Sequence, residues 1–326
     1  MGFRTVGRLR AGAALLSTIA LLVVPVGGAL ASPAERTERV HPSTRANVMK
    51  AMEAEGLAHA AYQAYAIQAD KERLPRVRDL YDRTAAEEFR RHFTEQAKLA
   101  GLLGNNADNL RDAIRTEAYE ASSLYRRFAA EAKADGEIVA FRLFTEIGQE
   151  EADHRDRFDE ALAAIKDPSS GAHILTDVSA EATTIPVGGP RVRSARTLRN
   201  LHTTMRREAL AYAKYTLYAE HAEATDVKAL ATLFHRTARV ELTEHFAEAA
   251  TLAGLVRDTR TNVCHTIFDQ TYEAHRLYGN FAQQAAEVGD RRAARLLLKA
   301  KRAQERYAHA FVAALSKIGG RCPGKR

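Results

Sequence analysis

The chain has 326 residues, of which 46% are hydrophobic and 27% are charged. This composition excludes a disordered protein and predicts packed cores, with room for two domains at about 100–200 residues each. The formal net charge is +7, and no stretch combines clustered Lys and Arg with interleaved aromatic residues, so nucleic-acid binding is not expected. The two cysteines lie in different regions, which excludes a CxxC metal or redox site.

The first 31 residues have the pattern of an export signal. Three arginines and no acidic residue precede residue 11, an almost wholly apolar run follows, and the segment ends in Ala29-Leu30-Ala31. This pattern is typical of a Sec-type signal peptide cut near Ala31, so we expect a secreted or cell-envelope protein without membrane association after cleavage. An uncleaved membrane anchor is the alternative, but Pro25 and Gly27 interrupt the helix that it would need. Residues 32–43 are interpreted as a polar leader.

Long stretches without proline predict helices in the rest of the chain. None of the eight prolines falls within 76–167 or 191–322, and apolar residues there recur at intervals of three and four. Clusters of Gly, Asn and Asp divide these stretches into separate helices. We therefore predict an all-α protein with helices at residues 44–70, 75–101, 107–134, 137–166, 196–223, 226–254, 260–288 and 290–318.

The two halves of the chain match at a constant offset of 153 residues. One offset that fits many pairs predicts a duplicated four-helix unit. Repeat 1 is predicted at 44–166 and repeat 2 at 196–318, with a linker at 167–195 and a tail at 319–326. The offset pairs Glu55 with Glu208, Tyr62 with Tyr215, Glu88 with Glu241, His92 with His245, Glu120 with Glu273 and Phe158 with Phe311.

Each predicted helix of repeat 1 carries acidic residues near its middle, several in pairs three or four residues apart that share a helix face. A Glu from each of two helices, with spaced pairs on the other two, is the ligand pattern of di-iron bundles. Carboxylates suit two iron ions, or manganese, and imidazole completes the coordination. Buried carboxylates also need such a counter-charge. The residues concerned are Glu55, Glu88, Glu117, Glu120, Glu151 and His154, whereas their neighbours Glu87, Glu150 and Asp153 are expected to be solvated.

Three motifs resemble the di-iron domain of rubrerythrins, a ferritin-like family. They are Glu55-x-x-Ala-x-x-x-Tyr62, the stretch from Asn109 to Tyr125 that contains Glu117-x-x-Glu120, and Glu151-x-x-His154. The resemblance covers both repeats and implies tandem ferritin-like four-helix bundles. It implies iron ligands at Glu55, Glu88, Glu117, Glu120, Glu151 and His154, with Tyr62 and Tyr125 as hydrogen-bond donors to them.

The resemblance also implies an activity, the reduction of hydrogen peroxide or dioxygen. Without Cys pairs for the rubredoxin module of classical rubrerythrins, the electrons must come from a separate, unknown donor. A ferroxidase or iron-sequestering protein and a metal-free helical binding scaffold are the alternatives. The oligomeric state is not predicted.

The chain departs from the family pattern in two ways. His92 follows Glu88 by four residues instead of three, which a one-residue π-bulge would correct, so His92 is also a predicted ligand. In repeat 2 the counterparts of Glu117, Glu151 and His154 are Gln270, Gln304 and Tyr307. These changes remove ligands and charge, and predict one complete site and one degenerate site.

The arrangement of the helices is left open by the sequence, although one feature bears on it. The connection at residues 102–107 spans at most about 20 Å, whereas a crossover along the preceding helix needs about 40 Å. Each repeat is therefore a plain up-and-down bundle, or the repeats exchange helix pairs; we favour the exchange. The second half of repeat 1 then meets Glu208, Glu241 and His245 instead of Glu55, Glu88 and His92.

The two cysteines lie at helix ends that are expected to be neighbours. Cys264 opens the third helix of repeat 2, and Cys322 follows its fourth helix. In an antiparallel pair these ends adjoin, and export to an oxidising compartment favours a disulfide. Two free thiols are the alternative.

Overall fold

The computed structural model describes residues 40–169 and 171–322, which form helices and no strand. The predicted signal peptide and most of the predicted leader lie outside the described residues. The observed helices follow the predicted ranges closely, and four of them contain a π-helical turn (η). The elements are α1 (Pro42–Lys71), α2 (Pro75–Glu87), η1 (Glu88–Phe93), α3 (Thr94–Ala100), α4 (Asn106–Tyr119), η2 (Glu120–Leu124), α5 (Tyr125–Ala134), α6 (Ile138–Lys166), α7 (Ala195–Ala224), α8 (Lys228–Val240), η3 (Glu241–Phe246), α9 (Ala247–Ala253), α10 (Thr259–Tyr272), η4 (Glu273–Tyr278), α11 (Gly279–Glu287) and α12 (Arg291–Lys317).

The same local signals end and begin helices in the two repeats. Gly101 ends α3 and Gly254 ends α9 in the left-handed conformation, with φ of 62° and 68°, which glycine adopts without a steric penalty. Four residues after each glycine, Asn105 and Asp258 cap α4 and α10 by accepting a hydrogen bond from a backbone N–H. The short connections predicted from the sequence are therefore sharp, capped corners.

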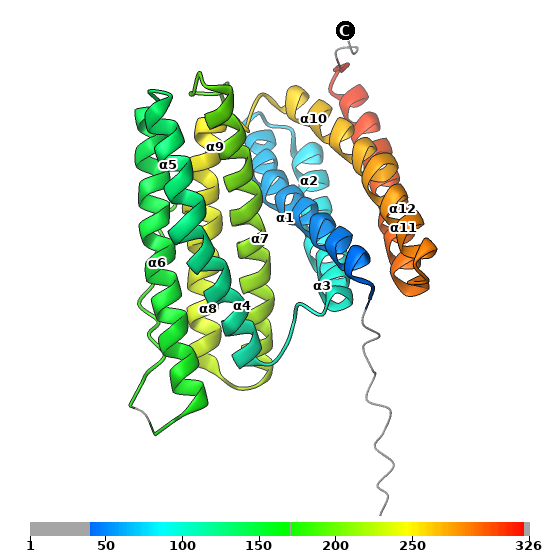
Figure 1. Ribbon diagram of the computed structural model, residues 1–326. Helices are drawn as coiled ribbons and strands as arrows, with labels where there is room; N and C mark the ends of the chain where they lie inside the picture. The colour runs from blue at the N-terminus through cyan, green and yellow to red at the C-terminus, as the bar shows by residue number, and fades with distance from the viewer. Residues whose placement is uncertain (1–39, 170, 323–326) are drawn as a thin grey trace, which may run out of the picture. The chain divides into compact units, whose positions relative to one another are not determined.

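The two repeats exchange helix pairs. Helices α4, α5 and α6 of repeat 1 pack with α7, α8 and α9 of repeat 2, and we call this group the central bundle (Figure 1). Helices α1, α2 and α3 pack with α10, α11 and α12, and we call this group the terminal bundle. Each sequence repeat thus contributes one half to each bundle, so the repeats are units of sequence but not of structure.

The linker between α6 and α7 supplies the long crossover that a ferritin-like bundle needs. Its backbone runs along α8, η3 and α9, where the carbonyl of Thr176 accepts from Arg236, Thr183 N donates to the carbonyl of Thr243, and Arg191 N donates to that of Leu252. These contacts follow the same order along the linker and along the helix formed by α8, η3 and α9. The linker therefore lies beside that helix over much of its length. The exchange therefore resolves the problem of the short connection at 102–107, because that connection now joins two bundles.

The bundles contact each other through α1 and α7, where equivalent positions of the repeats meet. Gly56 lies against the backbone of Ala209, its counterpart at the 153-residue offset. A Cβ atom on Gly56 would lie 3.1 Å from the Ala209 carbonyl oxygen, so only glycine allows this approach without a shift. Contact between equivalent positions indicates pseudo-two-fold packing of the repeats.

We expect Gly56→Ala to lower the free energy of unfolding by about 1–3 kcal/mol, the usual cost of overpacking. Denaturant unfolding followed by circular dichroism measures this change. Gly279→Ala is the matched control, because a Cβ there would meet its nearest atom at 3.5 Å, an ordinary contact. The control is expected to be neutral or slightly stabilising. Equal stabilities of the two variants would contradict the close approach at Gly56.

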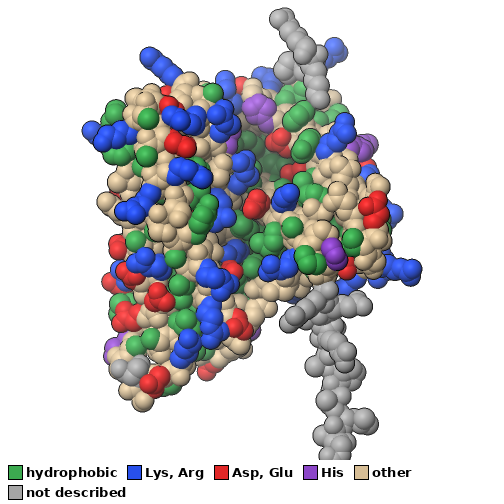
Figure 2. Space-filling view, in the orientation of Figure 1, with side chains coloured by type: hydrophobic (Ala, Val, Ile, Leu, Met, Phe, Trp, Pro, Cys, Tyr) green, Lys and Arg blue, Asp and Glu red, His purple; other side chains and the backbone are tan. Residues whose placement is uncertain are grey.

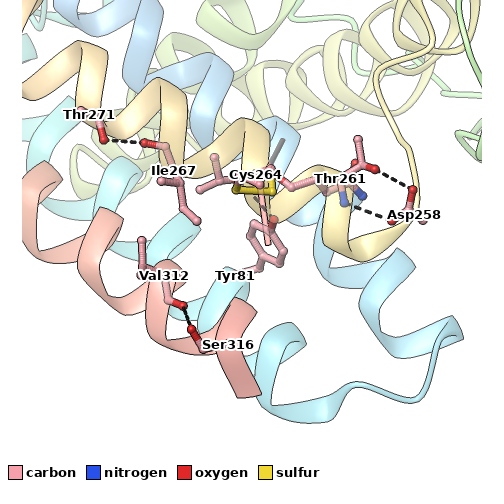
Figure 3. The surroundings of a disulfide bond; sticks show 11 residues. Tyr81, Asp258, Thr261, Cys264, Ile267, Thr271, Val312 and Ser316 are labelled. Carbon is pink, nitrogen blue, oxygen red and sulfur yellow. Dashed lines mark hydrogen bonds between the residues drawn. A yellow bond between two sulfur atoms is a disulfide. The ribbon is translucent and has the colours of Figure 1, made fainter. Parts of the chain in front are cut away.

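Cys264 and Cys322 form a disulfide that ties the start of α10 to the segment after α12. Their Cα atoms lie 5.4 Å apart. Figure 3 shows Tyr81 of α2 beside the bridge, so three helices of the terminal bundle meet here. None of the helices in residues 40–169 and 171–322 combines the length and the hydropathy that a membrane span requires.

Candidate metal centre

Seven acidic and imidazole side chains meet in the middle of the central bundle, and we call them the central cluster. Each of the four long helices of the central bundle contributes at least one of these side chains, and none of the seven residues is more than 4% exposed. The charged side chains on the molecular face in Figure 2 are a mixture of both signs and are separate from this buried set. The members are Glu117 of α4, Glu120 of η2, Glu151 and His154 of α6, Glu208 of α7, and Glu241 and His245 of η3.

A π-helical turn brings Glu241 and His245 together. The turn at Glu241–Phe246 adds the extra residue that the i,i+4 spacing requires, and the same turn is present at Glu88–Phe93. His245 Nδ1 lies 3.1 Å from Glu241 Oε2 as a result. The bulge predicted at His92 from the sequence is therefore present at both equivalent positions.

Potential ligand atoms in the central cluster form two overlapping groups. Glu117, Glu151, His154 and Glu241 form one, and Glu151, Glu208, Glu241 and His245 form the other, with the ligand atoms of each within 4.8 Å of one another. Glu151 and Glu241 belong to both groups. Both carboxylates also lie between the two imidazoles. His154 Nδ1 is 3.0 Å from Glu151 and 3.3 Å from Glu241. His245 Nδ1 is 3.2 Å from Glu151 and 3.1 Å from Glu241. Two shared carboxylates between two groups are the arrangement that bridges a pair of ions.

Without a metal, the central cluster must hold protons. Burial, together with the charges of Glu151 and Glu241, raises the pKa of Glu117, and burial raises the pKa of Glu120 to about 7 although Arg207 opposes it. Burial lowers the pKa of His154, but the carboxylates of Glu151 and Glu241, at 3.0 Å and 3.3 Å from its Nδ1, outweigh this and raise it to about 9. Metal ligation requires these groups to be deprotonated, so binding at neutral pH releases protons.

Orphaned oxygens test whether these residues fit a metal pair. Each of the five carboxylates has one buried oxygen without a hydrogen-bond partner among the described residues. Glu151 Oε1 lies 3.2 Å from His245 Nδ1 and Glu241 Oε1 lies 3.3 Å from His154 Nδ1, but neither contact is aligned as a hydrogen bond. Native proteins leave only a few such atoms per 100 residues, so five carboxylate oxygens in one place fit a site that binds cations. The atoms are Glu117 Oε2, Glu120 Oε2, Glu151 Oε1, Glu208 Oε2 and Glu241 Oε1.

Two tyrosines orient carboxylates of the central cluster. The hydroxyl of Tyr125 donates to Glu208, and the hydroxyl of Tyr215 donates to Glu117. In both pairs the tyrosine and the carboxylate belong to different repeats. The hydroxyls leave the second oxygen of each carboxylate free to bind a metal.

Two charged side chains link the central cluster to its surroundings. Arg207 Nε donates to Glu120 Oε1 at 2.6 Å, and Glu120 belongs to neither of the two overlapping groups. Glu150 Oε2 lies 2.5 Å from His245 Nε2, with the Glu150 side chain 35% exposed. Because a carboxylate on the distal imidazole nitrogen fixes the tautomer and orientation of a ligand histidine, Glu150 supports His245.

The structure separates the predicted residues into two places. Glu55, Glu88 and His92 do not join the central cluster; they form a second buried group, the terminal cluster, inside the terminal bundle. Tyr62 is there too, where its hydroxyl accepts a hydrogen bond from Gln270. Of the two predicted tyrosines, only Tyr125 therefore contacts the complete ligand set.

Sequence reasoning missed the roles of Tyr215, Arg207 and Glu150. The repeat offset contained a signal for Tyr215, since it is the counterpart of Tyr62 and the exchange moves it into that place. Glu87 and Asp153 are exposed, as expected, and Glu87 also accepts a hydrogen bond from Tyr307; Glu150 is only partly exposed and contacts His245, which was not expected. Adjacent Glu residues on one helix give no sign of which one reaches a buried histidine.

The terminal cluster has fewer ligands and a different charge balance. His92 Nδ1 lies 2.9 Å from Glu88 Oε2 and 3.5 Å from Glu55 Oε1. Burial and the nearby Glu55 raise the pKa of Glu88 to about 8. Burial lowers the pKa of His92, but Glu55 and Glu88 outweigh this and raise it to about 10. The replacements Gln270, Gln304 and Tyr307 lie in this bundle, on α10 and α12.

We expect Glu150→Gln to weaken iron binding at the central cluster by about 10–100-fold, the usual effect of losing such an outer partner. A competitive titration with a ferrous chelator under anaerobic conditions measures the affinity. Asp153→Asn is the matched control, because it removes the same charge from an exposed position on α6. If both variants bind iron equally well, Glu150 does not support His245.

Comparison with known proteins agrees with this geometry. The rubrerythrin family model matches residues 46–162. A rubrerythrin from Porphyromonas gingivalis is 30% identical over 139 residues, which cover 39% of this chain and 69% of the relative. This chain belongs to the rubrerythrin family. Nigerythrin from Nitratidesulfovibrio vulgaris is 30% identical over 135 residues, covering 37% of this chain and 67% of that protein. No solved structure gives a significant match.

As a member of the rubrerythrin family, this chain is a di-iron protein built from ferritin-like helical bundles. The family match runs from α1 into α6, and these helices are divided between the two bundles. A contiguous match in sequence therefore corresponds here to half of each bundle. The ligand set of one family domain is instead assembled from both repeats.

Proposed function

We propose that this protein is an exported di-iron oxidoreductase that reduces hydrogen peroxide or dioxygen with electrons from an external donor. The observation that carries the proposal is the central cluster, with its two overlapping groups that share Glu151 and Glu241. Oxygen-rich ligands with one imidazole in each group suit ferrous and ferric ions, and manganese is the other metal that fits. When bound, a pair of ferrous ions supplies the electrons for cleaving an oxygen–oxygen bond.

The side chains of this chain prepare the site for that chemistry. Tyr125 and Tyr215 hold Glu208 and Glu117 by one oxygen each. Arg207 holds Glu120 outside both groups, so the guanidinium competes with a metal for this carboxylate. Burial of the central cluster excludes bulk water and strengthens the electrostatic interactions within it.

A proton path from the surface to the site is part of the proposal. Glu150 is partly exposed, and its carboxylate touches the Nε2 atom of His245. The Nδ1 atom of the same ring faces Glu241 and Glu151. A proton held at Nε2 is therefore within reach of solvent, while the opposite side of the ring faces the carboxylates.

Export and the separate electron donor rest on the cysteines and the N-terminal segment. The two cysteines are joined in a disulfide, so they do not form an iron–thiolate electron-transfer centre. A disulfide also suits an oxidising compartment, in agreement with the signal-like pattern of residues 1–31. N-terminal sequencing of protein from its own host is expected to start at Ser32; an N-terminus at Met1 would contradict export by cleavage.

The proposed activity is tested by loading the mature protein with Fe(II) anaerobically and adding peroxide or dioxygen separately. With an artificial reductant present, we expect iron to be held and peroxide to be consumed over many turnovers. Iron oxidation without peroxide turnover would overturn the proposal in favour of a ferroxidase. The absence of stoichiometric metal would overturn it in favour of a helical scaffold.

A further inference from the structure

The terminal cluster is a buried polar site that the proposed function leaves unused. Ligand atoms of Glu55, Glu88 and His92 lie within 4.8 Å of one another, and none of these residues is more than 3% exposed. They come from α1 and η1 of repeat 1, and they face α10 and α12 of repeat 2 across the exchanged interface. A group of this kind is costly to bury unless its charges and hydrogen bonds are compensated.

The glutamines that replace metal ligands compensate these carboxylates only weakly. Gln304 Nε2 is 3.3 Å from Glu55 Oε1 and 3.4 Å from Glu88 Oε2, both at the long end of hydrogen-bond distances. Gln270 Nε2 makes a better contact with Glu88 Oε1, at 3.1 Å. The amide groups thus reach the carboxylates from α10 and α12 without satisfying them fully.

Several polar atoms of the terminal cluster have no hydrogen-bond partner among the described residues. They include Glu55 Oε2 and the amide oxygens Gln270 Oε1 and Gln304 Oε1; His92 Nε2 is unpartnered too, but it lies on the ring edge away from Nδ1, the nitrogen that faces Glu88 and Glu55. Both glutamines are fully buried. Turning either amide would direct its oxygen to the carboxylates, an orientation that is favourable only when a cation lies between them. The orphaned atoms therefore include charged and neutral metal ligands on opposite sides of one site.

The charge balance favours one divalent ion over two. Three carboxylates, those of Glu55, Glu88 and Glu273, remain where the central cluster has five, and one imidazole remains where it has two. The substitutions also remove the counterparts of both the shared carboxylate Glu151 and the ligand His154. What is left corresponds to a single coordination group without a bridge to a second one.

We propose that the terminal bundle binds one divalent metal ion through Glu55, Glu88 and His92, with the amide oxygens of Gln270 and Gln304 as neutral ligands. An ion held by donors from α1, η1, α10 and α12 ties the two exchanged halves of this bundle together. The site is distinct from the central cluster, and it does not depend on redox activity there. Mn²⁺ is the probe of choice, because carboxylate and carbonyl oxygens suit it and an imidazole is compatible with it.

The test is a crystal of the mature protein grown with Mn²⁺, with anomalous scattering recorded above the manganese edge and metal counted in dialysed solution. We expect an anomalous peak between Glu55, Glu88 and His92, and one ion fewer per chain in Glu88→Gln than in the wild type. Glu241→Gln makes the same change at the equivalent position of the central bundle. It is expected to weaken manganese binding at the central cluster and to leave the terminal peak in place.

A wild-type crystal with manganese in the central cluster and no peak in the terminal cluster would overturn this proposal while leaving the proposed function intact. A manganese peak in the terminal cluster, with no manganese in the central cluster, would support this proposal and contradict the proposed function. If Glu88→Gln does not fold, Glu55→Gln is the second variant, and the peak in wild-type crystals decides without either. An ion count in folded Glu88→Gln equal to that of the wild type would also overturn the proposal.

Discussion

Glu208→Ala is expected to abolish peroxide reduction, with a loss of more than about 100-fold, because even the loss of an outer partner costs 10–100-fold. Glu208 belongs to the group around His245, and its hydrogen bond from Tyr125 orients it toward that group. Without this carboxylate, one of the two overlapping groups keeps only Glu151, Glu241 and His245. Steady-state peroxide consumption by iron-loaded protein measures the effect.

Glu55→Ala is the matched variant, because Glu55 occupies the equivalent position of repeat 1. We expect its peroxide turnover to be unchanged, since Glu55 contacts Gln96, Tyr278 and Gln304 in the terminal bundle. Each variant is compared with the wild type in the same preparation, with circular dichroism to show that it is folded. Loss of turnover in Glu55→Ala with full activity in Glu208→Ala would contradict the exchange of helix pairs.

Much of this fold could be predicted because its signals are local. Helix ends follow from glycine at positions such as Gly101 and Gly254, and the duplication follows from a constant offset. The exchange could be favoured from chain length alone, since residues 102–107 are too short for a crossover. The linker's path along α8 and η3 was not predictable, because it depends on backbone hydrogen bonds such as that from Thr183 to Thr243.

The candidate site was predictable only as far as residue spacing carries the information. Glu117 and Glu120 share one helix face, and Glu151 and His154 share another, whichever helices pack together in the bundle. Which tyrosine contacts which carboxylate depends on the partner helix, and so Tyr62 was assigned to the wrong set of carboxylates. Arg207 had no signal at all, since its counterpart in repeat 1 is Ala54 and the offset gives no reason to expect a cation.

The exchange also explains how one bundle can keep its ligands while the other loses them. Substitutions in the second half of repeat 2, such as Gln270 and Gln304, affect only the terminal bundle. The first half of repeat 2 supplies Glu208, Glu241 and His245 to the central bundle and has kept them. In an unexchanged fold, the same substitutions would leave Glu208, Glu241 and His245 without their partners.

Cys264→Ser is expected to lower the free energy of unfolding of the terminal bundle by about 4 kcal/mol, as the chain-entropy model gives for a loop of this length. The disulfide closes a separation of 58 residues, and it joins the start of α10 to the chain beyond α12. Both ends lie in the terminal bundle, so its removal leaves the central cluster's own helices linked as before. Urea unfolding followed by circular dichroism measures the loss, with peroxide turnover recorded on the folded variant.

Turnover should persist in Cys264→Ser at temperatures where the terminal bundle remains folded, because the disulfide lies at α10 and after α12, whereas the central cluster lies on helices of the other bundle. A reducing agent is expected to destabilise the wild type by a similar amount and to leave the variant unchanged. If reduction lowers the stability of both proteins equally, the effect does not come from this disulfide. If the variant instead unfolds in a single transition that also abolishes turnover, the contact between α1 and α7 couples the two bundles, and the stability of the central cluster then depends on the distant bridge.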